Sequence, residues 1–152
     1  MRTKISAALF PIITLVVQDP TVDELNEMFN ELAKLLEKRP GKHVTLTDST
    51  AMRTMPDAKV RRFIADRQGV HNEKYGARGM GAVIILDSAL VRGALTAINW
   101  IRPLADRQEY VATRLEGMRV CVQWMEAEGL PVTEPLRSYL RTLERDARAA
   151  FP

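Results

Sequence analysis

The chain has 152 residues, of which 46% are hydrophobic and 27% charged, values typical of one packed domain that needs no disulfide or metal for its core. Its 22 Lys and Arg against 19 Asp and Glu give a net charge of +3, which supports no claim of nucleic-acid or membrane binding. The single cysteine, Cys121, excludes an internal disulfide and fits a reducing cytoplasm.

The N-terminal region resembles a signal peptide only superficially. An apolar run extends over Ile5–Val17, but Pro11 interrupts it, and Asp19 follows without a small-residue cleavage site. No segment has the ~20 apolar residues that span a bilayer. We therefore expect a cytoplasmic protein without stable membrane insertion.

The predicted elements begin with two strands, Lys4–Leu9 and Pro11–Val17, and the second is nearly continuously apolar. Thr21 and Glu24 form a T-x-x-E capping box. The helix Val22–Lys38 follows, with its apolar residues at helical spacing.

A short strand, His43–Thr47, is followed by a polar loop and by a second helix that opens at Pro56 and Asp57. The glycine-bearing segment 76–81 precedes a strand, whereas a dinucleotide cradle follows one, so we predict a turn there. Residues 81–86 form a third buried strand.

A third helix starts at Asp87 and Ser88 and runs to Ile101, and a weaker strand covers residues 109–112. Thr113 begins another T-x-x-E capping box ahead of a fourth helix, and Thr133 caps a last one. Strands that alternate with helices imply a parallel sheet, while the first two strands pair as a hairpin. We predict an α/β fold with a mixed, mostly parallel sheet of four or five strands, packed with helices, plus an extra C-terminal helix.

This order and length resemble the STAS domain (sulfate transporter and anti-sigma factor antagonist), particularly the bacterial STAS-like proteins of uncharacterised function. Three stretches carry the resemblance: His43-Val-Thr-Leu-Thr-Asp48-Ser49, Ser88-Ala-Leu-Val-Arg-Gly-Ala-Leu-Thr-Ala-Ile-Asn-Trp100 and Glu109-Tyr-Val-Ala-Thr. The resemblance covers residues 1–130, so residues 131–152 are predicted to be a C-terminal helical extension.

One feature of the STAS family does not carry over. Phosphorylated members have a serine at the start of the helix after the strand that ends in aspartate. Aligning Asp48 with that aspartate places Asp57 at or near the serine position, while Ser49, Thr50 and Thr54 lie earlier. Asp57 is therefore predicted to be a plain N-cap, with a fixed negative charge in place of a phosphate as the alternative.

Metal and catalytic patterns are missing from the sequence. His43, His71 and Cys121 show no H-x-x-H or C-x-x-C spacing, so neither a metal nor a cofactor is predicted. Ser49 and Ser88 lack a G-x-S-x-G context, and Ser88 is most simply an N-cap. Cys121 is predicted to be a packed thiol and His71 to have a surface or capping role. We therefore expect no enzyme.

Two charged segments have alternative interpretations. The second helix carries six basic against three acidic residues without interleaved aromatics, which favours a solvated face over a nucleic-acid site. The last helix has an apolar face of Leu136, Tyr139, Leu140 and Leu143. It either docks on the domain's own core or packs against a second copy or another partner.

The resemblance implies a non-enzymatic, regulatory protein–protein interaction module whose partner is another protein or a second copy bound through the C-terminal helix. Its expected interaction rim comprises Asp48, Ser49, Asp57, Ser88 and Arg92. The alternative function is a binding domain for a lipid, a nucleotide or an anion. In that case a pocket is expected near the start of the 87–101 helix, where Arg92 could hold an anionic group.

Overall fold

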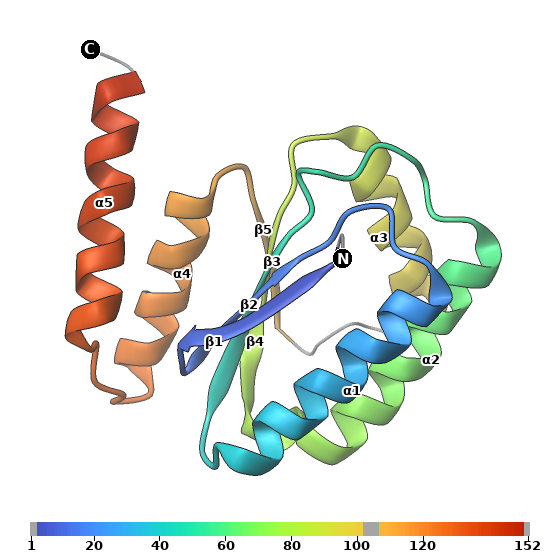
Figure 1. Cartoon of the computed structure of the whole chain (residues 1–152), viewed down its shortest axis with the longest axis horizontal. Helices are drawn as coiled ribbons and strands as arrows, with labels where there is room; N and C mark the ends of the chain where they lie inside the picture. The colour runs from blue at the N-terminus through green and yellow to red at the C-terminus, as the bar shows by residue number, and fades with distance from the viewer. Residues whose placement is uncertain (1–2, 102–106, 151–152) are drawn as a thin grey trace.

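The structure, a computed structural model, describes residues 3–101 and 107–150 (Figure 1). Five strands form one sheet in the order of the sequence. They are β1 (Lys4–Leu9), β2 (Ile12–Val16), β3 (His43–Asp48), β4 (Gly79–Ile85) and β5 (Gln108–Val111). β1 pairs antiparallel with β2, and every other pairing is parallel. The predicted α/β class, the hairpin and the mostly parallel sheet are confirmed.

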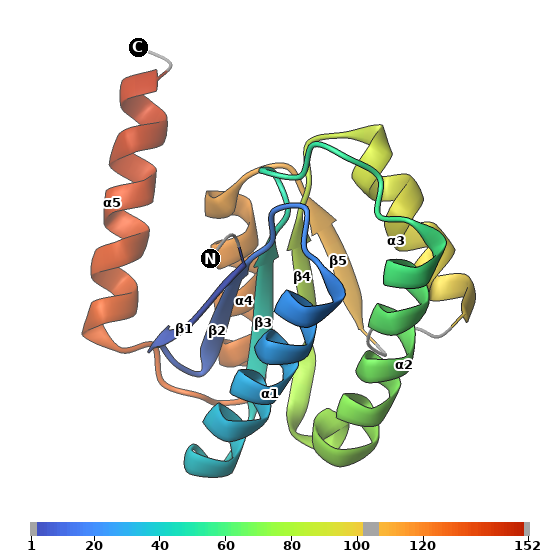
Figure 2. The same ribbon diagram turned by 45° about the vertical axis from the view of Figure 1, so that its right-hand side comes forward.

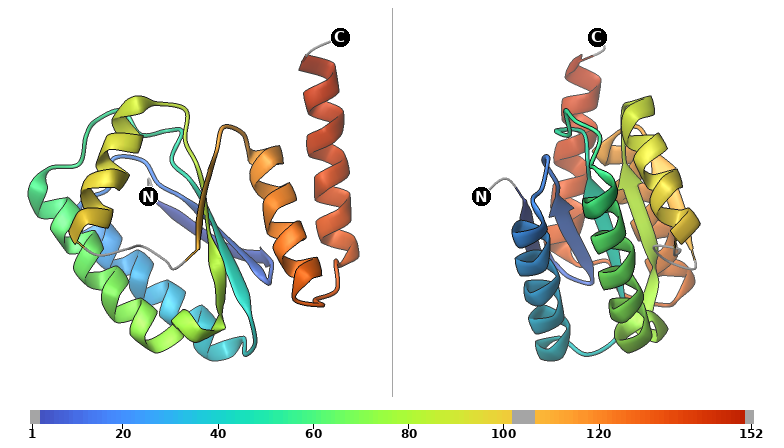
Figure 3. Two further views of the ribbon diagram at one scale, coloured as in Figure 1. Left: turned by 180° about the vertical axis from the view of Figure 1, so that it is seen from behind. Right: turned by 90° about the vertical axis from the view of Figure 1, so that its right-hand side faces the viewer.

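The helices cover the two faces of the sheet unequally. They are α1 (Val22–Lys38), α2 (Ala58–Tyr75), α3 (Ala89–Ile101), α4 (Arg114–Ala127) and α5 (Glu134–Ala150), with a short 3₁₀ turn η1 (Gly76–Arg78) after α2. Helices α1, α2 and α3 lie side by side on one face, and α4 lies on the other (Figure 3). Helix α5 packs on the outer side of α4 (Figures 1 and 2).

The predicted helix starts agree closely with the structure. The hydroxyl of Thr21 accepts the N–H of Glu24, and the Glu24 carboxylate accepts the N–H of Thr21, which completes the capping box. The predicted turn after α2 is correct for residues 76–78, but β4 begins at Gly79, two residues earlier than expected. The strand starts early because Gly79 pairs with His43 of β3.

The face of the sheet under α4 holds a continuous apolar core. Val44 and Leu46 of β3 and Val83 of β4 pack there with Met118 and Cys121 of α4. Cys121 is fully buried, and burial raises the pKa of its thiol to about 12. The predicted packed thiol is confirmed.

Helix α5 docks on this same core, which is one of the two alternatives that the sequence left open. Leu136 is fully buried, and Tyr139, Leu140 and Leu143 pack beside it while half-exposed. An ion pair between Arg119 of α4 and Glu144 of α5 spans 3.6 Å. The apolar face predicted for this helix therefore covers α4 and not solvent.

Truncating Leu136 to alanine is expected to lower the free energy of unfolding by about 2–4 kcal/mol, because it leaves a cavity in the α4 core. Urea denaturation followed by circular dichroism measures the change. The exposed Ser138 lies two residues further along the same helix, and Ser138→Ala serves as the control, with an expected change within about 0.5 kcal/mol. Equal stability of the Leu136→Ala and Ser138→Ala variants would show that α5 does not contribute to the core.

Candidate functional site

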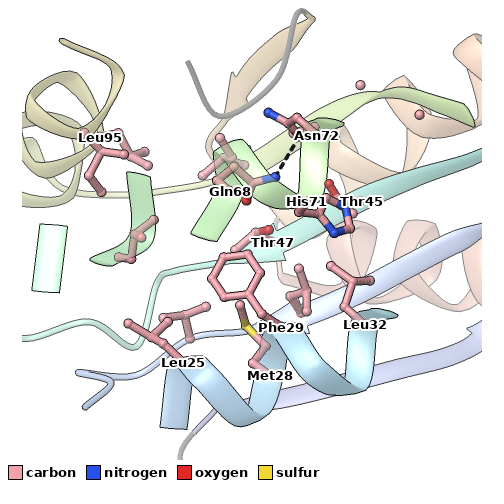
Figure 4. Close-up of a pocket in the computed structure, with 18 of the residues that line it drawn as sticks. Leu25, Met28, Phe29, Leu32, Thr45, Thr47, Gln68, His71, Asn72 and Leu95 are labelled. Atoms are coloured by element: carbon pink, nitrogen blue, oxygen red, sulfur yellow. Dashed lines mark hydrogen bonds between the residues drawn. The ribbon is translucent and has the colours of Figure 1, made fainter. Parts of the chain in front are cut away.

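A cavity of about 570 Å³ lies between the sheet and the layer of α1, α2 and α3. Figure 4 shows its walls: side chains from α1, α2, α3 and the sheet point into one elongated space. The volume is within the range of small-molecule sites, about 300–1,000 Å³. This cavity is the strongest candidate site within residues 3–101 and 107–150.

Two of the walls are apolar. Helix α1 contributes Leu25, Met28, Phe29 and Leu32, which recur at the three- and four-residue spacing that places side chains on one helix face. The wall opposite consists of α3 side chains: Val91, Ala94, Leu95 and Ile98. An apolar body of a ligand would bury its surface between these two helices.

The sheet forms a third wall, which is unexpectedly polar. Side chains of β3 alternate between the two faces, so His43, Thr45 and Thr47 face the cavity while Val44 and Leu46 face α4. Helices cover both faces of this strand, and a strand buried on both sides ordinarily carries apolar residues throughout. In the described residues, the hydroxyls of Thr45 and Thr47 have no hydrogen-bond partner, which leaves them available to a ligand.

Helix α2 completes the polar side of the cavity. Gln68 donates a hydrogen bond of 3.0 Å to the Asn72 side chain, and His71 lies between them in sequence (Figure 4). The His71 ring stacks at an angle on Tyr75, with 5.2 Å between the ring centroids. His71 therefore does not have the surface or capping role predicted for it, because its ring packs inward against Tyr75 and the cavity.

Both histidines are neutral at physiological pH. Burial, together with the nearby His71 and Arg78, lowers the pKa of His43 to about 4. Burial likewise lowers the pKa of His71 to about 4, with an added effect of Arg67. His43 is 3% exposed, and its Nδ1 has no hydrogen-bond partner among the described residues. The site thus contains a buried polar atom without a partner, which is uncommon in folded proteins.

The two ends of the cavity differ in chemistry. The end near the carboxyl termini of the strands is lined by Val17, Pro20, Met52, Pro56 and by Ser49. The end near the amino termini is lined by His43 and by residues from the end of α2 and the start of β5, among them His71, Glu73, Tyr75 and Arg107. All of the ionisable side chains that line the cavity in the described residues therefore lie at one end.

The predicted interaction rim lies at the carboxyl ends of the strands, away from the end of the cavity that holds the ionisable side chains. Each rim side chain already has a partner. Asp48 forms a 2.9 Å ion pair with Arg114, and it accepts hydrogen bonds from the N–H and hydroxyl of Thr50. Burial alone would raise the pKa of Asp48, but these hydrogen bonds outweigh it and hold the pKa below its ordinary value. The Ser49 hydroxyl donates a 2.6 Å hydrogen bond to the carbonyl of Ile85, which ties β3 to β4.

The other three rim residues sit at helix starts. Asp57 accepts the N–H of Val60 at 2.9 Å, as the N-cap role predicted for it requires. Ser88 accepts the N–H of Val91 at 3.3 Å. The guanidinium of Arg92 lies 5.6 Å from the centre of the Tyr110 ring. Of the five rim residues, only Ser49 also lines the cavity.

Sequence reasoning missed Thr45, Thr47, Gln68 and Asn72, and it placed His43 in the chain without assigning it a site. One signal was present: the strand His-Val-Thr-Leu-Thr alternates apolar and polar residues although helices flank it on both sides in the chain. Such alternation in a strand between two helices indicates a polar cavity on one face. The pairing of that face with α2 depends on tertiary packing, which a single sequence does not contain.

Some kinds of site find no support in the described part of the chain. It contains no group of three or more His, Cys, Asp or Glu side chains arranged to hold a metal ion. Among the described helices, none combines the length and the apolar character that crossing a membrane requires. Compared with known proteins, the chain matches no protein-family model and no curated protein sequence. The resemblance to the STAS domain accordingly stays a prediction.

Proposed function

We propose that this protein is a binding domain for a small, mainly apolar molecule that occupies the cavity under α1, α2 and α3. The observation that carries the proposal is the combination of two apolar walls with a polar wall of Thr45, Thr47 and His71. A mainly apolar cavity with a few convergent polar groups is the usual form of a small-molecule site. This is the alternative function considered from the sequence, and the cavity favours it over the interaction rim.

The proposed role is one of binding without catalysis. Ser49 is the serine that lines the cavity in the described residues, and its hydroxyl is engaged with the Ile85 carbonyl. Nucleophilic catalysis requires a nucleophile within hydrogen-bond reach of a base that a third group orients. His43 and His71 have no such nucleophile as a hydrogen-bond partner in the described residues.

Native mass spectrometry of the purified protein tests the proposal, with a denatured sample as the reference. We expect a bound mass that disappears on denaturation. Ala94→Phe should abolish it, because Ala94 is buried against the cavity and the larger side chain fills the space. Ala89→Phe is the matched control on the same helix at an exposed position, and it should retain the bound mass. An equal fraction of ligand-bound protein in the two variants would contradict the proposal. Wild-type protein that carries no bound mass from any expression host would contradict it as well.

A second candidate function, the STAS-like regulatory interaction module, is favoured by the outer face of α3. Trp100 is 84% exposed, and Leu90 and Ile101 are exposed on the same helix. Large apolar side chains in such positions are typical of protein-binding surfaces. Light scattering at rising concentration tests a second copy as the partner, with Trp100→Ser as the comparison. A monomer at every concentration would rule out self-association.

A further inference from the structure

The cavity extends along the whole of β3. It is lined from His43, the first residue of β3, to Ser49, just after its last residue. Six residues of extended strand cover ~20 Å. A ligand with an extended body can therefore lie along the strand and reach both ends of the cavity.

The two ends of this cavity select an orientation for an amphipathic ligand. The end near Val17, Met52 and Pro56 is apolar and suits a hydrocarbon terminus. The other end is lined by two imidazoles, that of His43 at the start of β3 and that of His71 in the last turns of α2. A polar head group would therefore lie beside His43 and His71.

The charges around the two imidazoles are mainly positive. Arg78, next to His43, donates its hydrogen bonds to the carbonyls of Leu36, Arg39 and Gly41 and not to a carboxylate. Arg67, next to His71, donates to the side-chain oxygens of Asn26 and Asn30 on α1. Among the described residues neither guanidinium is in direct contact with a carboxylate, although Arg78 contributes to the lowered pKa of Glu37.

The acidic groups at this end are paired with other residues or lie at the margin of the cavity. Glu37 of α1 is 3.2 Å from the Lys74 ammonium and accepts a hydrogen bond from the Tyr75 hydroxyl. Glu73 lines the cavity but is exposed at its margin. Arg107 is turned onto the Trp124 ring, 4.0 Å from its centre. The end of the cavity is thus suited to a group that brings a negative charge.

We infer that the ligand is an elongated monocarboxylic acid whose carboxyl group lies between His43 and His71 and whose apolar body extends between α1 and α3. This inference rests on the proposed function. An unpaired carboxylate would be costly to bury, so binding is accompanied by the uptake of one proton from solvent, held between the carboxyl group and an imidazole. The hydrogen bond so formed satisfies the partnerless Nδ1 of His43.

Two probes of equal chain length test the inference: dodecanoate and dodecan-1-ol, titrated calorimetrically into the full chain at pH 7.5 and 6.0. Because one proton enters with the acid, its affinity should rise about tenfold or more at the lower pH. The affinity of the alcohol should change less than about twofold. The chain has two histidines, so imidazole NMR resonances report them directly. Dodecanoate should raise at least one histidine titration midpoint by about three pH units, from about 4 to about 7, because only a group that titrates near neutrality takes up a proton between pH 7.5 and 6.0.

His71→Gln and His43→Gln provide the matched variants, since glutamine retains hydrogen bonding but takes up no proton. Each should weaken dodecanoate binding about tenfold at pH 6.0 and remove most of its pH dependence, and each should weaken dodecan-1-ol binding by a smaller factor that does not depend on pH. His71→Gln is the primary variant, because His43 is fully buried and its replacement can affect folding.

Equal binding of both probes, with no pH dependence and no shift of the histidine resonances, would overturn the carboxylic-acid inference and leave the binding function intact. If neither probe binds and native mass spectrometry detects no bound mass, the proposed function is overturned as well. The two failures are therefore distinguishable.

Discussion

Replacing Gly81 with alanine is expected to lower the free energy of unfolding by about 3–5 kcal/mol. Gly81 has a φ of +139°, a backbone conformation that costs a residue with a side chain of order 1–3 kcal/mol. A Cβ atom there would also lie 2.7 Å from the Trp124 ring and 2.8 Å from the Arg107 carbonyl oxygen. Relieving that overlap requires backbone movement at the start of β5, which adds about 1–3 kcal/mol.

Gly41 separates the two contributions. It also has a positive φ, +100°, but a Cβ atom at this position meets nothing within 4 Å. Gly41→Ala should therefore cost only about 1 kcal/mol, from the backbone alone. Urea denaturation of both variants at pH 7.5 gives the comparison. If Gly81→Ala is no less stable than Gly41→Ala, the close approach of α4 and β5 to β4 is wrong.

Acidification from pH 7 to pH 5 is expected to lower the free energy of unfolding by about 4 kcal/mol through the two histidines. Their pKa values fall from 6.5 in the unfolded chain to about 4 in the folded one. Below pH 6.5 the unfolded state binds more protons, so stability falls as the pH drops from about 6.5 to about 4. The buried His43 alone accounts for about 2 kcal/mol of this change.

The double variant His43→Gln, His71→Gln provides the control for the pH dependence. Denaturation midpoints of the double variant should change little between pH 7 and pH 5, because the remaining carboxylates titrate at lower pH. Each single variant should retain about half of the wild-type pH dependence. A wild-type protein equally stable at pH 7 and pH 5 would mean that neither histidine is buried in the neutral form.

The fold was largely predictable because its signals are local. Capping boxes such as Thr21 with Glu24 fix helix starts within a few residues, and Pro and Gly mark helix ends. The alternation of strands and helices then leaves few topologies. The N-cap role of Asp57 was predictable on the same grounds, since its hydrogen bond to Val60 spans three residues.

The candidate site was not predictable because its parts come from distant segments. The prediction placed function at the carboxyl ends of the strands, where Asp48 and Ser49 lie. In the structure Asp48 forms an ion pair with Arg114, which lies 66 residues further along the chain. The polar wall depends equally on the packing of α2 over β3, which brings His71 near His43. Burial of both imidazoles is a tertiary property that neither local spacing nor composition contains.

The sequential strand order affects where in this fold a ligand site can lie. Many open α/β sheets reverse their direction of winding near the middle, so that the loops at the carboxyl ends of two neighbouring strands diverge and leave a crevice for ligands. Here the chain advances from β2 to β5 without reversing, and its three crossover helices lie on one face. The loops at that edge consequently do not diverge, and the proposed ligand site lies between the sheet and its helices and not in a crevice above the sheet.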